Sequence, residues 1–298
     1  MALLGHPVHL PLARGLVQAA YQSYLKSIWW MHRTFGIRTF GLGWVASQIG
    51  FEFAFRFRSV PFRFVPTAAG LYRILPAGLP NEPELHTFLN RVLQDRGQVL
   101  FVDVGAGIGE FAIPMAHDPR VSSVLAFEAH PDTCLALQQS ARLAPAGRIA
   151  VIGKGVSKAC GYSSLEFQGP GGRVSHDRVE VCTLDTAVQA NPQQAVIVLI
   201  DMKGGELDVL RGARHLVRNN MPLIIFEYSE ATRRAYPLEA VALTLGPGYT
   251  LMRLRSEDGL LDDEFNDTWN LVALPHRGVW ADLLRNPNLF ARPQRLAA

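Results

Sequence analysis

The sequence lacks the residue patterns of several protein classes. Its three cysteines lie far apart and form no Cys-x-x-Cys motif, which argues against a disulfide framework or a zinc ribbon and favours a reducing compartment. No uncharged apolar run reaches the roughly 18 residues that a membrane-spanning helix needs, and the N-terminus lacks the basic start of a secretory signal. We therefore expect a cytoplasmic protein, with attachment to a membrane surface left open.

Charged residues are also scarce. They make up 18% of the 298 residues, against 48% hydrophobic residues, and this balance excludes an intrinsically disordered chain. The length allows one large domain or two of ordinary size. The net charge is +3, but residues 1–75 contain eight basic residues and one acidic residue. The composition thus predicts a basic N-terminal part followed by a mildly acidic remainder.

The N-terminal part is predicted to form a helix and a β-hairpin. Apolar side chains recur every three or four positions over residues 14–35, which is typical of an amphipathic helix. Residues 51–57 place four phenylalanines on one face and, with 62–65, predict the hairpin. Alternating Phe and Arg suits a half-buried sheet better than base stacking, so no nucleic-acid partner is expected. Residues 14–65 either pack on the main domain, contact a membrane surface or form a dimer face.

Strands and helices alternate from residue 84 onward. Apolar strands are predicted at 99–104, 122–127, 149–152, 196–200 and 223–226, with helices at 84–94, 131–143, 205–217 and 230–243. Short strands that alternate with helices indicate a parallel sheet covered on both faces. Residues 161–184 interrupt the alternation as a hairpin insertion with its turn at 169–172. Residues 249–254 and 270–274 are predicted to form a final antiparallel pair.

The strongest motif is a glycine loop that follows a strand and opens a helix. It contains Asp103, Gly105, Gly107 and Gly109, and alternate glycines let a ligand approach the backbone closely. A dinucleotide loop would need glycine at position 110, where an acidic side chain, Glu110, is unfavourable beside a pyrophosphate. The pattern favours S-adenosylmethionine (SAM), with Asp103 near its ammonium group. An NAD-dependent oxidoreductase is the less favoured alternative.

Three further acidic residues stand at the ends of apolar strands. Glu128 follows the second strand, where an acid is well placed to accept hydrogen bonds from ribose hydroxyls. Asp201 ends another strand and is expected to face the methyl group or hold a substrate hydroxyl. Glu227 ends the next strand, and an acid there needs a partner or a ligand, so we assign it to substrate binding.

Seven blocks in the same order resemble the FkbM family of SAM-dependent methyltransferases. They are Asn81–Glu84, Val102–Gly109, Phe127–Pro131, Val181–Asp185, Ile200–Glu206, Pro222–Glu227 and Asn270–Pro275. The resemblance implies an α/β, Rossmann-like class I methyltransferase fold with a seven-stranded, mostly parallel sheet and a final antiparallel strand. It also implies O-methylation of a hydroxyl on a glycan, a glycolipid or a secondary metabolite. We expect an N-terminal extension (1–80), the methyltransferase domain (81–275) and a C-terminal tail (276–298).

One departure from the family bears on catalysis. The family's Lys-Ile-Asp-Val-Glu-Gly appears here as Leu199-Ile-Asp-Met-Lys-Gly204, so Lys203 replaces a glutamate. We assign Asp201 as the base or the residue that orients the acceptor, and Lys203 as the group that holds an acidic acceptor or lowers its pKa. The alternative is a catalytically degenerate SAM-binding or scaffold protein that docks on a membrane or partner. No spacing of acidic residues and histidine compels a metal site, so no metal is expected.

Overall fold

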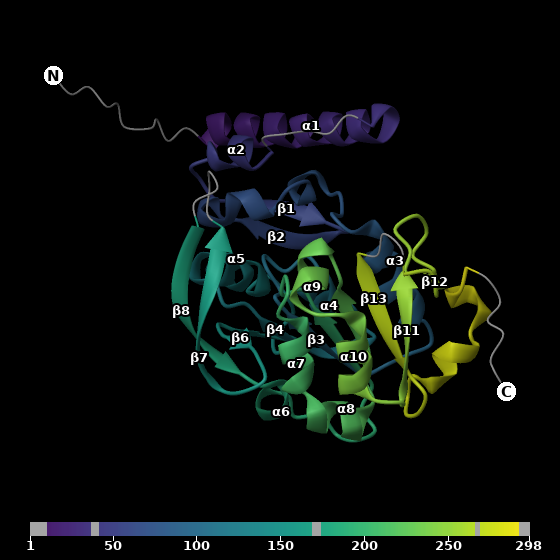
Figure 1. Cartoon of the computed structure of the whole chain (residues 1–298). Helices are drawn as coiled ribbons and strands as arrows, with labels where there is room; N and C mark the ends of the chain where they lie inside the picture. Colours follow the sequence, from purple (N-terminus) through teal and green to yellow (C-terminus); the bar gives the residue numbers. More distant parts are fainter. Residues whose placement is uncertain (1–10, 37–41, 169–173, 266–268, 292–298) are drawn as a thin grey trace.

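An eight-stranded sheet forms the centre of the computed structural model, which describes residues 11–36, 42–168, 174–265 and 269–291 (Figure 1). The strands lie in the order β12-β11-β13-β10-β9-β3-β4-β5. Their bounds are β3 Val99–Val104, β4 Val121–Phe127, β5 Ile149–Ile152, β9 Val196–Ile200, β10 Leu223–Glu227, β11 Tyr249–Leu254, β12 Leu261–Asp262 and β13 Asn270–Pro275.

The strand directions confirm the predicted Rossmann-like fold. The five strands from β5 to β10 are parallel, whereas β13 runs antiparallel to both of its neighbours, β10 and β11. The two-residue strand β12 adds an eighth member at the edge of the seven that were expected. Every residue of β3, β9, β10 and β13 is buried. Central strands covered on both faces are mainly apolar, which is why these runs were evident in the sequence.

Two predicted helices are each divided into two. The helix expected at 205–217 consists of α7 (Glu206–Arg211) and α8 (Arg214–Asn220). Gly212 lies between them, and a Cβ there would be 2.2 Å from the carbonyl oxygen of Ser157. The helix expected at 230–243 consists of α9 (Glu230–Ala235) and α10 (Leu238–Leu245), with the extended residue Pro237 between them. The single-helix predictions were wrong because a close backbone contact and a proline interrupt the two segments.

The helices expected at 84–94 and 131–143 are present as α3 (Pro83–Val92) and α5 (Pro131–Ala141). The helix expected to follow the glycine loop is α4 (Ala112–His117), and the short α6 (Leu184–Ala187) was not predicted. The predicted insertion forms a separate sheet of β6 (Gly155–Val156), β7 (Gly161–Gln168) and β8 (Val174–Cys182). Its predicted turn at 169–172 lies outside the described residues.

The N-terminal segment packs on the same core as the sheet. It contains α1 (Pro11–Phe35), α2 (Leu42–Ser47) and the hairpin β1 (Phe53–Phe57) and β2 (Val60–Phe64), which lie along the top of the molecule in Figure 1. The hairpin phenylalanines on its inner face are buried in one cluster with the side chains of α3 and β3. Tyr21, Leu25 and Ile28 of α1 are buried, whereas Leu16, Trp30 and Phe35 are exposed. In the described part of the chain, no helix is both long and apolar enough to cross a membrane.

The residues after β13 also pack on the main body. Trp280 is fully buried, and its indole N–H donates a hydrogen bond to the carbonyl of Val196 at 2.9 Å. Short 3-10 helices follow at Ala281–Arg285 and Pro287–Leu289. The described part of the predicted tail, 276–291, therefore belongs to the folded body.

Candidate active site

Candidate ligand-binding residues form one row along the carboxyl edge of the sheet. Phe226 of β10 pairs with Ile200 of β9, and the amide of Asp201 donates to the carbonyl of Val104 at 2.9 Å, so these strands end together. The row has one member from each of five adjacent strands, namely Glu128 after β4, Gly105 after β3, Asp201 after β9, Glu227 at the end of β10 and Asn270 at the start of β13. The carboxyl edge of such a sheet is where α/β folds bind their ligands. All but one of these residues had been selected from the sequence.

The three glycines of the loop have different surroundings. All have positive φ, at +80° for Gly105, +55° for Gly107 and +93° for Gly109. A Cβ on Gly105 would lie 2.1 Å from the carbonyl oxygen of Asp201, and one on Gly109 would lie 2.6 Å from the side chain of Ile113. Around a Cβ on Gly107, the nearest atom is the loop's own carbonyl oxygen at 4.0 Å. Packing therefore requires two of the glycines, while the space beside Gly107 is open to a ligand.

The Glu128 carboxylate is fixed at the opening of this loop. One oxygen accepts a hydrogen bond from the amide of Gly107 at 2.9 Å, and the other accepts one from the amide of His130 at 2.7 Å. Burial raises its pKa. Each carboxylate oxygen has a second lone pair, so Glu128 can still accept a hydrogen bond from a ligand hydroxyl.

Asp103 is buried beneath the loop with one oxygen unused. Only 2% of its surface is exposed, and Oδ2 has no hydrogen-bond partner among the described residues. Burial, reinforced by the charge of Asp201, raises the pKa of Asp103 to about 8. A buried polar atom without a partner is unfavourable. A cationic group at the loop would provide the missing partner, so this residue fits the ammonium of SAM.

Asp201 and Glu227 are hydrogen-bonded through their carboxyl groups at the ends of adjacent strands. Glu227 is 7% exposed, whereas Asp201 is open to solvent. Burial, then the hydrogen bond to Asp201, raises the pKa of Glu227 to about 8. At neutral pH Glu227 is therefore the protonated partner and donates to Asp201. This arrangement leaves the accessible carboxyl group of Asp201 in the middle of the row.

Lys203 follows Asp201 on an exposed loop. Its φ is +47°, and in the described part of the chain its ammonium makes no hydrogen bond or ion pair. Buried Glu206 holds this loop, since its carboxylate accepts hydrogen bonds from the amide of Met202 at 3.1 Å and from the hydroxyl of Tyr236 at 2.9 Å. Glu206 therefore stabilises the loop that carries Lys203. Among the described residues, no three His, Cys, Asp or Glu side chains are grouped to hold a metal ion.

The sequence analysis missed an acid that is hydrogen-bonded to a member of the row. The amide Nδ2 of Asn270 donates to Glu82 at 2.9 Å. Burial, with the nearby charges of Asp201 and Glu110, raises the pKa of Glu82 to about 7. Glu110, considered only as an argument against a dinucleotide, accepts hydrogen bonds from the backbone and side-chain amides of Asn81 at 2.8 and 2.6 Å. The signal was available, because both Glu82 and Asn270 lie in the blocks that resemble the family.

Part of the chain matches a known protein family. Residues 103–245 match the family described as "Methyltransferase FkbM domain", and no curated protein matches the chain. Among solved structures, the FkbM methyltransferase of Methylobacillus flagellatus KT is 21% identical, with a TM-score of 0.44. That match covers 60% of this chain and 44% of the other, so it spans less than half of the Methylobacillus protein. TYW2 of M. jannaschii, solved in complex with AdoMet, is 14% identical over 74% of this chain and 84% of its own, with a TM-score of 0.41.

Proposed function

We propose that this chain, whose residues 103–245 match the FkbM methyltransferase domain, is a SAM-dependent methyltransferase that methylates a hydroxyl group of a small molecule or glycan. When bound, SAM supplies a methyl group on a positively charged sulfur, ready for in-line displacement by an oxygen nucleophile. The chain's own residues bind the two reactants, orient them and accept the proton of the hydroxyl. Holding two reactants in line can remove about 7–11 kcal/mol of the barrier.

The observation that carries this proposal is the accumulation of acidic groups around the glycine loop. The negative charges of Asp201, Glu128 and Glu110 lie near Asp103, and together they oppose the ionisation of its carboxyl group. A ligand with an ammonium and a sulfonium group relieves this repulsion, whereas the pyrophosphate of NAD would add to it. The charge at the loop thus supports SAM over a dinucleotide.

Each residue near the cofactor has a specific proposed role. The backbone at Gly105 and Gly107 borders the ligand, the Asp103 carboxylate pairs with its ammonium, and Glu128 accepts hydrogen bonds from its ribose hydroxyls. Two backbone amides already position the carboxylate oxygens of Glu128, and this observation supports its assignment to the ribose. Gly109 contributes indirectly by letting the loop pack on Ile113.

The acceptor is proposed to bind beside Asp201. This accessible carboxylate takes the hydroxyl proton or orients the hydroxyl, a function that contributes about 10²–10⁴-fold to a rate. Protonated Glu227 donates a hydrogen bond to Asp201 and so holds the Asp201 carboxyl group in position beside the acceptor. The unpaired ammonium of Lys203, two residues further on, is placed to attract an anionic acceptor.

Titration calorimetry with SAM tests the cofactor assignment. We expect saturable binding by the wild type and at least a tenfold weaker affinity for Glu128→Ala. Glu239→Ala is the matched control, because Glu239 is exposed on α10 and belongs to no part of the row. Absence of binding by a folded wild-type protein, or equal affinity for the two variants, would contradict the assignment.

Transfer of tritiated methyl from SAM to a panel of alcohols, methyl glycosides and glycolipids tests the reaction. Asp201→Asn should keep the affinity for SAM and reduce the initial rate about 10²–10⁴-fold. If the initial rate is the same in Asp201→Asn and in the wild type, Asp201 is not the base. Tight SAM binding without transfer to any member of the panel would favour the binding-only alternative suggested by Lys203.

A further inference from the structure

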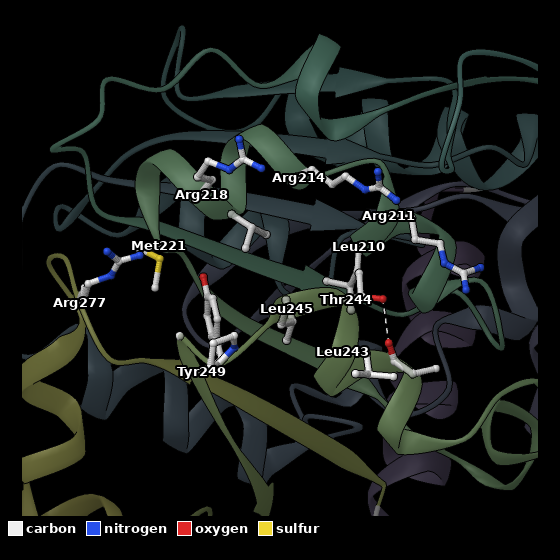
Figure 2. Close-up of a pocket in the computed structure, with 14 residues that line it drawn as sticks. Leu210, Arg211, Arg214, Arg218, Met221, Leu243, Thr244, Leu245, Tyr249 and Arg277 are labelled. Atoms are coloured by element: carbon white, nitrogen blue, oxygen red, sulfur yellow. Dashed lines mark hydrogen bonds between the residues drawn. The ribbon is translucent and has the colours of Figure 1, made fainter.

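A cavity lies at the opposite edge of the sheet from the glycine loop. Its volume is about 590 Å³, and it is bordered by α7, α8, α10 and the start of β11 (Figure 2). Met221 lies two residues before β10, and Tyr249 begins β11, so the cavity lies where these two strands start. The cavity lies at the start of β10 and Glu227 at its end, and each residue of this five-residue strand adds about 3.3 Å between them. The cavity is therefore distinct from the proposed cofactor site.

The charged side chains that line this cavity are all basic. Four arginines line it, Arg211, Arg214, Arg218 and Arg277, and no acidic residue is among the described residues that border it. Arg211 forms an ion pair with Asp208 at 3.1 Å. For the other three, the described part of the chain shows no ion pair. Guanidinium groups that share a cavity repel one another unless an anion lies between them.

The opposite wall of the cavity is apolar. Figure 2 shows Leu243 and Leu245 of α10 across from the arginines of α7 and α8. Leu243 is 83% exposed, so its side chain is accessible to a ligand. The hydroxyls at the cavity already have partners, since Thr244 donates to the carbonyl of Ala240 at 2.7 Å and Tyr249 to that of Pro222 at 3.2 Å. Recognition of a polar ligand group there thus depends on the guanidinium groups.

We propose that this cavity binds an organic phosphate, with the phosphate at Arg214, Arg218 and Arg277 and the apolar part against Leu243. A guanidinium group presents two parallel N–H donors that match phosphate oxygens, and a dianion satisfies several arginines at once. The volume lies within the range of small-molecule sites, about 300–1,000 Å³. The same phosphate chemistry can come from a free phosphate ester or from the headgroup of an anionic lipid.

Calorimetric titration with phenyl phosphate tests the site. We expect saturable binding that weakens at least tenfold in the double variant Arg214→Gln/Arg218→Gln. Arg142→Gln/Arg285→Gln removes the same charge from exposed positions outside the cavity and should change affinity less than twofold. Leu243→Ser should weaken phenyl phosphate more than inorganic phosphate, because only the ester has an apolar part. Circular dichroism and thermal unfolding confirm that each variant is folded.

Sedimentation with vesicles of phosphatidylcholine and phosphatidic acid identifies the source of the phosphate. Vesicle binding that is lost in Arg214→Gln/Arg218→Gln supports a lipid headgroup, and phenyl phosphate binding without arginine-dependent vesicle binding supports a free ester. No saturable binding of phenyl phosphate, or equal binding by the cavity variant and its control, overturns the proposal. SAM affinity should be the same in all of these variants, so the result does not depend on the proposed methyl transfer.

Discussion

Glu227 and Asp201 share a hydrogen bond between carboxyl groups because they occupy equivalent positions at the ends of two parallel strands. Two carboxyl groups can make this contact only while one of them retains a proton. The raised pKa of Glu227, about 8, provides that proton at neutral pH. The pair therefore couples the geometry of the proposed acceptor site to protonation.

This coupling predicts a stability that falls as the pH rises. The pKa values of Glu227, Asp103 and Glu82 are raised to about 8, 8 and 7, so the folded protein binds more protons than the unfolded chain above about pH 4. Their stabilisation is complete below that pH and is lost as the pH rises toward 8. We expect the Tm to decrease between pH 5 and 8.5.

Glu227→Gln should make that decrease less steep, because the amide cannot ionise but still donates to Asp201. In a protein of this size a change of 1 kcal/mol shifts the Tm by roughly 2–4 °C, which scanning calorimetry at several pH values resolves. Glu239→Gln, on the exposed start of α10, should follow the wild type. A variant Glu227→Gln whose Tm follows the wild-type curve throughout would show that this proton does not stabilise the fold.

Proton release on SAM binding is the expected consequence of the buried Asp103 carboxyl. With a pKa of about 8, Asp103 is mainly neutral at pH 7, and pairing with an ammonium requires the ionised form. Calorimetry in two buffers of different ionisation enthalpy should detect release of up to one proton per SAM. Asp103→Asn should abolish most of the release and weaken SAM at least tenfold, while Glu227→Gln should retain it. Identical binding enthalpies in both buffers would refute the role of Asp103.

Gly105 and Gly107 should respond differently to alanine. At Gly105 the new Cβ would meet the carbonyl oxygen of Asp201 at 2.1 Å, so the ends of β3 and β9 would have to separate. We expect Gly105→Ala to lose more than about 3 kcal/mol of unfolding free energy, as in severe overpacking. At Gly107 only the positive φ opposes alanine, at a cost of roughly 1–2 kcal/mol. Denaturant unfolding measures both.

The SAM affinity of Gly107→Ala tests where the cofactor lies. Gly107→Ala should fold and yet bind SAM at least tenfold more weakly, because its methyl group would enter the space left for the cofactor. Full SAM affinity in Gly107→Ala would mean that the cofactor does not approach this part of the loop.

The row of edge residues could be predicted because parallel strands in register bring their last residues together. Buried strands such as Val196–Ile200 are continuous apolar runs, so the acid that ends each run is conspicuous. Glu82 lies in a block that resembles the family, but its contact with Asn270, 188 residues away, forms only in the folded chain. The break at Gly212 likewise depends on a contact with Ser157 that no local pattern reveals. The arginine cavity combines three separate segments, each unremarkable in the sequence.

The three cysteines should differ sharply in reactivity, because only one is both exposed and acidified. Hydrogen bonds with Thr186, then with Thr183, lower the pKa of the Cys160 thiol, and the Sγ to Oγ1 distance to Thr186 is 3.4 Å. Burial raises the pKa of Cys134 and of Cys182. The thiolate is the reactive form, so limiting iodoacetamide at pH 7.5 should alkylate Cys160 first, at least ten times faster than the others by peptide mass spectrometry. Thr186→Val should slow that labelling several-fold, whereas Thr244→Val, in the distant arginine cavity, should not. Equal labelling of Cys160 and Cys182 in the native protein would show that these hydrogen bonds do not activate the thiol.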